Sequence, residues 1–576
     1  MNYEEALAFL NGLPSFGRQP GLGRMGRLMK ALGSPHKGPK WVHVAGTNAK
    51  GSVCAMVDSI LREAGYVTGL YISPHLERFE ERISVNSCSI TREDVARLVK
   101  RLAQMVKELF DEPITHFEFV TAMCFEYFRE LGIEVGVLEV GLGGRLDATN
   151  IIEDPAVVVI TPVSLDHTDR LGHTVTEIAR EKAGIIKRGA IVVCGPQLPE
   201  AEVVVRETCA MNGCRIFDVR EGVSWQERSF GLDGQELEIE TPKRHLSGVR
   251  IPLLGRHQQA NAATAVLVAD ALGESGLEID DDAVKAGLAK VKWPGRLEIL
   301  KREPCVVVDG AHNPAAAAAL SQALKDLFPG KRLVLLLGML RDKAVKDVVE
   351  RLVPLAETVV VSSPPSARAL PAEKLAEHVK AHTHNVIVRE EIEQGMDEAL
   401  GMLNACDVLC ITGSLYMVGK AREHLLGSGV NRGVKAATRV RFRRLDPGKL
   451  GFCEASKEAG IHVYSNAEHF ERSFGVSEKR LGVNFRSEVV CLVSRGTKPT
   501  GGYSINVKEV RREGDTIVID VTTNDPGPYQ FVTMMMCTPL AVIALPKREL
   551  QGSTELCFVV TDTTGCTLAS RRALIW

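Results

Sequence analysis

Residues 43–52, HVAGTNAKGS, have the composition of a loop that binds phosphate. Such a loop needs successive backbone N–H groups at a helix N-terminus and one lysine that reaches the terminal phosphates. Gly46 follows an apolar run, Lys50 carries the charge, and Ser52 places a hydroxyl at the expected helix start. The usual pattern G-x-x-x-x-G-K-[ST] has five residues between its first glycine and its lysine, whereas only three separate Gly46 from Lys50, and it has glycine where Ala49 stands. Taken alone, the stretch also fits an ordinary strand, turn and capped helix.

Polar residues follow two other apolar segments. VLEVGLGGRLDATN places Glu139 at the end of an expected strand, before a glycine turn that should expose Arg145 and Asp147, and SLDHTDRLG places Asp166 and His167 after another strand. Open α/β sheets hold ligands at the carboxyl ends of their strands. A carboxylate and an imidazole there could surround a divalent ion together with nucleotide oxygens. Taken singly, His167 is more typical of a structural histidine.

Lys182 lies in REKAGIIK, residues 180–187, between charged neighbours. That pattern alone is typical of a solvated helix face.

The elements that must position these residues form two α/β units. Mostly unalternating apolar runs separated by helical patterns predict a parallel sheet covered on both faces within residues 1–295. The expected strands lie at 41–45, 67–72, 135–142, 156–163 and 190–195, and the expected helix at 52–64. The alternation resumes in residues 296–427, a smaller unit. Its expected strands lie at 304–310, 332–340, 358–363, 385–390 and 407–414, with a helix opened by Asn313 and Pro314.

The remainder changes character. Residues 428–444 are glycine-rich and basic, which predicts a solvated linker. Residues 445–576 contain alternating β-branched segments bounded by turn residues, which predict a β-rich unit.

Composition limits the partners and the compartment. The 576 residues include 70 basic and 72 acidic side chains, so no global field recruits nucleic acid or anionic lipid, and we expect small-molecule substrates. The N-terminus lacks the pattern of a secretory signal, and no apolar run reaches about 18 residues, so we expect no membrane association. Fourteen cysteines without a C-x-x-C pair favour reduced thiols in a cytoplasmic protein.

Many ordered motifs over about residues 1–425 resemble folylpolyglutamate synthase and dihydrofolate synthase, within the Mur ligase superfamily. They are GTNAKGS, YISPHLERFEERISVN, HFEFVTA, LEVGLGGRLDATN, LDHTDRLG, REKAGIIK, LLGRHQQANAA, WPGRLE, DGAHNP, GMLRDKA and ITGSLYMVGKAR. The family loop reads G-T-N-G-K-G-[ST], so Ala49 alone departs from it. The resemblance implies a Mur ligase-like P-loop ATPase domain and a smaller Rossmann-like α/β ligase domain.

The implied reaction is ATP-dependent. A carboxylate of dihydropteroate, or the γ-carboxylate of a folate, attacks the γ-phosphate of ATP, and the amino group of L-glutamate displaces phosphate from the acyl phosphate. One alternative is another Mur-type amide ligase, which SPHL and ERISVN disfavour. A second is an inactive ligase scaffold for the β-rich unit, against which the intact Lys50, Glu139, His167 and Lys182 argue.

The resemblance also implies roles for individual residues. Lys50, His167 and Lys182 are expected to be catalytic. The residues expected to bind ATP are Thr47, Asn48, Ala49, Lys50, Gly51, Ser52, Asn261, Arg296, Asp309 and His312. The residues expected to hold two magnesium ions are Ser52, Ser73, Glu139, His167 and Lys182, the last as a carbamate. The candidates for the pterin side are Arg24, Phe117, Glu118, Arg145 and Asp147.

The β-rich unit has a resemblance of its own. RGTKPTGGYSINV at residues 495–507, NDPGP and TPLAVIALPK resemble the C-terminal domain of the protease-complex subunit family PrcB. This implies an interaction module with an unknown protein partner, attached to a catalytic part expected to be monomeric. By itself TKPTGGY is also typical of a glycine hairpin.

Overall fold

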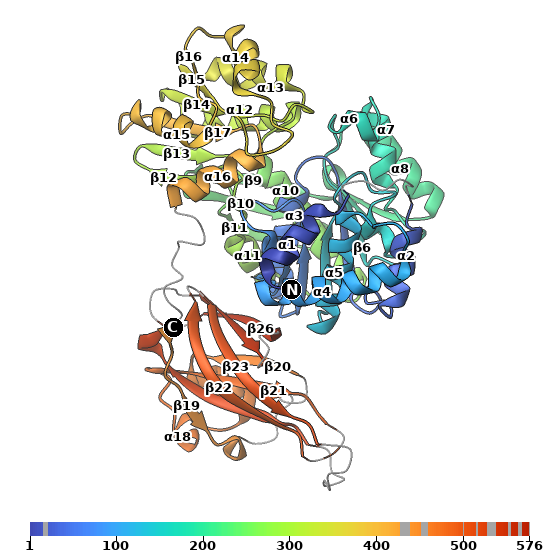
Figure 1. Ribbon diagram of the computed structural model, residues 1–576, viewed down its shortest axis with the longest axis vertical. Coiled ribbons are helices and arrows are strands. Elements are labelled where there is room, and N and C mark those ends of the chain that lie inside the picture. Colours follow the sequence, from blue (N-terminus) through green and yellow to red (C-terminus); the bar gives the residue numbers. More distant parts are fainter. Residues whose placement is uncertain are drawn as a thin grey trace.

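The computed structural model describes residues 1–14, 21–426, 438–450, 459–498, 500, 502–513, 516–526, 537–550, 555–562 and 567–574. Three units follow one another along the chain, and the β-rich third unit lies on the far side of the first unit from the second (Figure 1).

The first unit is built on an eight-stranded sheet with the order β4-β3-β2-β5-β1-β6-β7-β8. All neighbours are parallel except the antiparallel pairs β2–β3 and β3–β4. The strands are β1 (Lys40–Ala45), β2 (Thr68–Tyr71), β3 (Ile83–Val85), β4 (Cys88–Ser89), β5 (Val135–Glu139), β6 (Val157–Ile160), β7 (Ile191–Cys194) and β8 (Arg215–Asp218). The parallel sheet predicted from unalternating apolar runs is confirmed, and β1 lies near its centre.

Helices cover both faces of this sheet, as the apolar runs require. One face packs against α3 (Lys50–Glu63), α10 (His257–Glu274) and α11 (Asp281–Lys290). Across the sheet, two further clusters are formed with α1 (Tyr3–Gly12), α2 (Gly23–Ala31), α4 (Arg92–Leu109), α5 (His116–Glu130), α7 (Val175–Ala183) and α8 (Pro199–Asn212). The short helices are α6 (Thr168–Leu171) and α9 (Val219–Gly222).

An antiparallel three-stranded sheet precedes α10, and the sequence patterns did not predict it. It consists of β9 (Ser224–Gly231), β10 (Gly234–Glu240) and β11 (His245–Ile251). Only one side of it is buried, through residues such as Leu237, Ile239 and Val249.

The second unit has a six-stranded sheet of order β12-β13-β17-β14-β15-β16. Its strands are β12 (Glu298–Arg302), β13 (Cys305–Val308), β14 (Leu333–Leu337), β15 (Thr358–Val361), β16 (Val386–Val388) and β17 (Val408–Thr412). Its helices are α12 (Pro314–Leu327), α13 (Val345–Leu352), α14 (Ala372–Lys380), α15 (Ile392–Gly401) and α16 (Leu415–Leu426). Asn313 caps α12 through a bond from Ala316 N, with Pro314 in the first helical position, as predicted.

The third unit packs a five-stranded sheet, β18-β22-β23-β25-β26, against a four-stranded sheet, β19-β24-β21-β20. The strands are β18 (Thr438–Arg439), β19 (Arg443–Leu445), β20 (Ala459–Tyr464), β21 (Glu488–Arg495), β22 (Ser504–Glu513), β23 (Thr516–Asn524), β24 (Leu540–Pro546), β25 (Glu555–Thr561) and β26 (Thr567–Leu574). The helices α17 (Ala467–Phe474) and α18 (Glu478–Leu481) cover the outer face of the smaller sheet. The β-rich prediction is confirmed.

The linker predicted at residues 428–444 falls partly on residues that the structure describes. Residues 428–437 lie outside the described residues, but 438–439 and 443–445 form strands of the third unit. Arg443 of β19 pairs with Glu488 there, at 2.9 Å.

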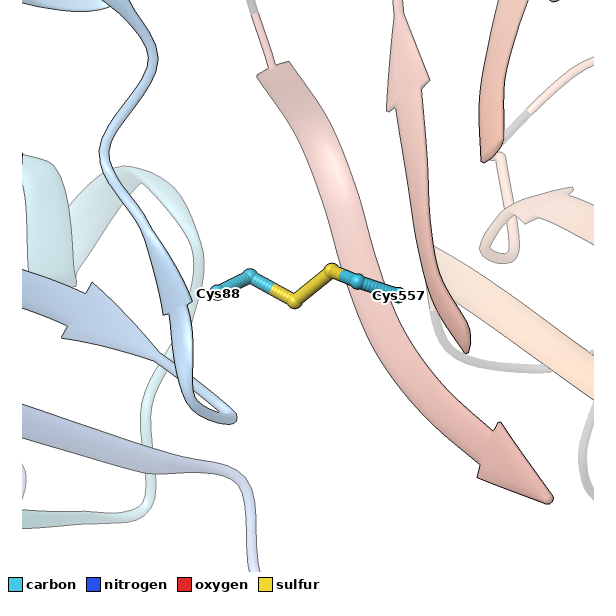
Figure 2. The surroundings of a disulfide bond; sticks show 2 residues. All are labelled: Cys88 and Cys557. Carbon is cyan, nitrogen blue, oxygen red and sulfur yellow. A yellow bond between two sulfur atoms is a disulfide. The ribbon is translucent and has the colours of Figure 1, made fainter. Parts of the chain in front are cut away.

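A disulfide joins Cys88 of the first unit to Cys557 of the third (Figure 2). The expectation of reduced thiols throughout is therefore wrong for this pair, whereas ten other described cysteines are free. The two cysteines are 469 residues apart in sequence, so the local spacing of cysteines could not predict this bond. No helix among the described residues is long and apolar enough to cross a membrane.

Candidate functional site

The loop between β1 and α3 has the geometry expected of a phosphate-binding loop. Helix α3 begins at Lys50, and its N-cap Ala49 has a left-handed backbone, with φ 68° and ψ −9° and no side-chain cap. The first amides of α3 therefore stay available for an anion, where the helix dipole favours negative charge. The Ala49 methyl packs against the apolar core of the first unit. This burial offsets part of the strain of a left-handed alanine, about 1–2 kcal/mol.

Two glycines of this loop are required by close packing. A Cβ on Gly46, whose φ is 155°, would lie 1.8 Å from Thr161 Oγ1. A Cβ on Gly51 would lie 2.4 Å from the ring of Trp293. The amides of Thr47 and Asn48 both donate to the carbonyl of Pro162, at 3.0 and 3.1 Å. The loop is thus fixed to the segment that follows β6.

Lys50, Glu139 and Ser73 converge from three neighbouring segments. Lys50 Nζ lies 3.2 Å from the carbonyl oxygen of Thr47 and 3.9 Å from Glu139 Oε1. Glu139 Oε2 accepts a bond from the Ser73 amide at 3.1 Å. Burial raises the pKa of Glu139, and the Lys50 charge opposes that shift. A buried carboxylate is therefore held beside the lysine of the loop.

Lys182 is buried, with 5% of its surface exposed, so it does not lie on the solvated helix face of which its local sequence pattern is typical. Its Nζ donates to the carbonyl of Gly46 at 2.7 Å, which places the amine beneath the loop. Burial, and then repulsion from Lys50, lower the pKa of Lys182 to about 7. A substantial fraction of this amine is therefore neutral near neutral pH.

His167 precedes α6 with a left-handed backbone, φ 50°. Burial and the nearby Lys343 lower the pKa of His167 to about 4, so the ring is neutral and one nitrogen can act as a ligand.

Asp166 joins the two α/β units. Its Oδ1 accepts a bond from Lys343 Nζ at 2.6 Å, and its Oδ2 lies 3.3 Å from Asn313 Nδ2 and 3.4 Å from His312 Nε2. Burial alone would raise the pKa of Asp166, but His312 and Lys343 hold it well below its usual range. Asn313 Nδ2 also donates to Asn48 Oδ1 at 3.0 Å, so the phosphate loop itself contacts the second unit.

Sequence reasoning assigned no role to Lys343. Its partner Asp166 is 177 residues away, and the available signal was the GMLRDKA motif, which was used only for the resemblance. With 6% of its side chain exposed, Lys343 is the buried cation of this interdomain contact.

A single cavity of ≈ 400 Å³ brings together the residues predicted for ATP and metal. It is lined from the first unit by Gly46 to Ser52, Ser73, Glu139, His167, Lys182 and Asn261, and from the junction and second unit by Arg296, Asp309 and His312. Asp309 has a defined position because it accepts bonds from the amides of Leu297 and Ala311, both at 2.8 Å. Asn261 donates to Gln258, which lies 3.5 Å from the Ser52 hydroxyl.

The residues predicted for the pterin side do not line this cavity. Arg24 and Glu118 form a two-point ion pair with each other, both contacts at 3.1 Å. Phe117 packs on Gly141, where a Cβ would lie 2.5 Å from its ring, and Gly141 does line the cavity. Phe117 thus stands behind the cavity wall.

Arg145 and Asp147 differ from the expectation that the glycine turn exposes both. Arg145 is exposed and pairs with Glu181 at 2.9 Å, but Asp147 is buried. The Asp147 carboxylate accepts bonds from the amides of Gly141 and Leu142 at 3.1 and 3.0 Å. Those amides would otherwise be unsatisfied, so this side chain holds the turn after β5.

Among the described residues no group of three or more His, Cys, Asp or Glu side chains could hold a metal. The predicted magnesium ligands are of mixed type, with one carboxylate, one imidazole, two hydroxyls and one lysine. Oxygen donors suit magnesium, which usually keeps several waters and substrate phosphates among its ligands.

Comparison with known proteins identifies three matched regions. Residues 44–269 match the Mur ligase middle domain, 295–415 the Mur ligase glutamate ligase domain, and 489–546 the PrcB C-terminal domain.

Curated relatives cover the two α/β units. The dihydrofolate synthase/folylpolyglutamate synthase of Bacillus subtilis is 36% identical over 434 residues, which cover 73% of this chain and 99% of that protein. The folylpolyglutamate synthase of Lacticaseibacillus casei is 35% identical and covers 74% of this chain and 99% of its own length.

Solved structures of folylpolyglutamate synthases are similar over the same two α/β units. Mycobacterium tuberculosis folylpolyglutamate synthase, complexed with ADP and AMPPCP, is 35% identical with a TM-score of 0.68, over 74% of this chain and 99% of that chain. E. coli FolC, in complex with DHPP and ADP, is 31% identical with a TM-score of 0.66, over 73% of this chain and 97% of that chain.

Proposed function

Because the chain belongs to the folylpolyglutamate synthase and dihydrofolate synthase family, we propose that the cavity between its α/β units is where L-glutamate is joined to dihydropteroate or a folate. The protein is an ATP-dependent ligase. One observation carries the assignment of the site: the phosphate loop of one unit and Arg296, Asp309 and His312 line the same cavity.

The reaction begins with two anions that repel each other. At about 4 Å and an effective dielectric near 20, each pair of unit charges costs about 4 kcal/mol. Lys50 and the free amides of α3 offset this repulsion at the γ-phosphate. A carboxylate oxygen of the substrate attacks the γ-phosphorus and ADP leaves. The glutamate amine then attacks the acyl carbon, and phosphate departs with that oxygen.

Magnesium ions would be held by Ser52, Ser73, Glu139, His167 and Lys182. The fit is supported by the carboxylate of Glu139 on the cavity wall and by the neutral ring of His167. When bound, magnesium supplies positive charge that neutralises phosphate oxygens. The protein's own part is to orient these donors, since the Ser73 amide fixes Glu139.

Lys182 is proposed to be carbamylated. A neutral amine can attack carbon dioxide, forming an N–C bond and releasing one proton, and the product is an anion that can approach a cation. Support comes from the burial of the amine and from its position at the carbonyl of Gly46. This chemistry converts a poorly placed buried cation into a ligand.

The pterin side is proposed to lie beside the cavity wall formed by Gly141, where Phe117 supplies an aromatic surface. The Arg24–Glu118 pair would anchor this region and Arg145 would meet the acidic substrate, while Asp147 supports the turn.

We further propose that residues 1–295 and 296–427 act as two domains that close on ATP, and that the enzyme works as a monomer in the cytoplasm. A complete nucleotide cavity within one chain supports the monomer.

The direct experiment offers purified protein ATP, magnesium and labelled glutamate with dihydropteroate, tetrahydrofolate or a muramyl precursor. The proposal predicts labelled product and ADP in equal amounts with a pteridine substrate. The Lys50→Ala variant should abolish both, which excludes a contaminating ATPase. Turnover with the muramyl precursor alone, or wild-type turnover by Lys50→Ala, would refute the assignment.

A further inference from the structure

The third unit has an outward-facing apolar contact on β25. Leu556, Phe558 and Val560 face the core between the two sheets of this unit, so the intervening Cys557 and Val559 face outward, because side chains alternate along a strand. These outward residues are nevertheless buried, with 5% and 6% of their surfaces exposed.

The first unit covers this contact. Cys88 begins β4, an edge strand of the eight-stranded sheet, directly after a turn in which Asn86 and Ser87 have left-handed backbones. Figure 2 shows the Cys88 side chain reaching from this hairpin to the strand that carries Cys557. Cys88, Cys557 and Val559 form a separate apolar cluster. Two of its three members are the cysteines themselves, so the covalent bond dominates this cluster.

We propose that Cys88 and Cys557 form a reversible redox latch that fixes the β-rich unit to the hairpin of residues 83–89. A dithiol reductant opens it: one thiolate attacks a sulfur of the pair, a mixed disulfide forms, and the second thiol displaces the remaining cysteine. The chain then carries two thiols and the reductant a disulfide. A low-molecular-weight disulfide closes the latch by the reverse exchange.

The structure favours a latch over a catalytic device. No described residue of the third unit lines the ATP cavity, so opening the latch leaves that cavity intact. Opening exposes Val559 and the outward face of β25. The redox state therefore controls the accessibility of the β-rich unit, independently of the ligase reaction.

The test uses the full chain with a specific protease site inserted within residues 428–437. After treatment with glutathione disulfide and cutting, the two fragments should stay linked on a denaturing gel without reductant and should elute together from a sizing column. After treatment with dithiothreitol they should separate in both. Cys88→Ser and Cys557→Ser should each behave as the reduced protein, and Cys406→Ser, at an exposed free cysteine, as the oxidised wild type.

Circular dichroism shows whether each cysteine variant is folded. Treatment of the wild type with dithiothreitol opens the disulfide without any substitution, so that comparison does not depend on the folding of a variant. The latch is overturned if reduced wild-type fragments still elute together, because the contact then stands without the bond. It is also overturned if peptide mapping of the oxidised protein finds no Cys88–Cys557 link. Neither result depends on ligase activity.

Discussion

Ala49 has a left-handed backbone directly before Lys50, where the general phosphate-loop pattern G-x-x-x-x-G-K-[ST] has glycine. Ala49→Gly removes strain of about 1–2 kcal/mol but adds backbone entropy of about 0.5–1 kcal/mol to the unfolded chain and loses a packed methyl. We predict a stability change within about 1 kcal/mol and an ATP affinity within about threefold of wild type. Urea unfolding and calorimetric titration of a nonhydrolysable ATP analogue measure both.

The matched control is Ala318→Gly, the same change at an exposed position within α12. Because Ala318 lies in a right-handed helix, glycine relieves no strain there, and the substitution should lower the free energy of unfolding by about 1 kcal/mol. Equal destabilisation by the two substitutions would show that Ala49 carries no strain.

We expect Lys182 to be essential for turnover because its carbamate supplies a negative charge. We predict that Lys182→Ala loses turnover and that acetate or formate restores part of it, because a short carboxylate can occupy the space of the lost carbamate. Steady-state ADP formation with and without the added acid is the measurement. Arg180→Ala, at an exposed position of the same helix, should keep wild-type activity, and added acetate or formate should not change that activity. Unchanged activity of Lys182→Ala would contradict the role.

Within β1, His43 is fully buried and contacts Thr149 Oγ1 at 2.8 Å. Burial, and then Lys187, lower the pKa of His43 to about 3, against about 6.5 in the unfolded chain. Between those values the unfolded chain binds one more proton, so stability must fall as pH falls. By pH 5 the loss from this group is about 2 kcal/mol. Between pH 7.5 and pH 5, the free energy of unfolding of His43→Gln should therefore fall by about 2 kcal/mol less than that of the wild type, as measured by urea unfolding. Identical pH profiles of the two proteins would contradict this role of His43.

The contact between the segment after β6 and the segment before α13 holds the two α/β units together through Lys343 and Asp166. Lys343→Met leaves the partly buried Asp166 without its nearest cation. We predict a loss of about tenfold or more in kcat/KM, about 1.4 kcal/mol. Lys346→Met, the same change at an exposed position of α13, should be silent. Wild-type kinetics in Lys343→Met would show that this pair does not assemble the site.

At the scale of the whole molecule, short-range patterns predicted most of the architecture. Apolar runs located β1, β2 and β5 to β7 of the first sheet and β13 to β17 of the second, because burial on two faces leaves an unalternating signature. The same reasoning missed β3, β4 and β8 to β12, and it assigned the strands at 438–439 and 443–445 to a linker. The burial of Lys182 was not predicted from its charged neighbours, and its role at the metal stays a prediction made from the resemblance.

The sequence patterns could not predict the contacts between the three units. The Asp166–Lys343 pair and the Cys88–Cys557 bond join residues 177 and 469 positions apart, and neither periodicity nor spacing encodes such distances. Asp147 was expected to be exposed on a glycine turn, but its carboxylate instead satisfies the amides of that turn.

In the proposed reaction, phosphorylation activates the substrate carboxylate. A pteridine substrate labelled with ¹⁸O in the reacting carboxylate tests this step, with mass spectrometry of the inorganic phosphate as the measurement. Transfer through an acyl phosphate predicts one ¹⁸O in each phosphate released together with the glutamate product. Product formed together with unlabelled phosphate would exclude an acyl phosphate intermediate.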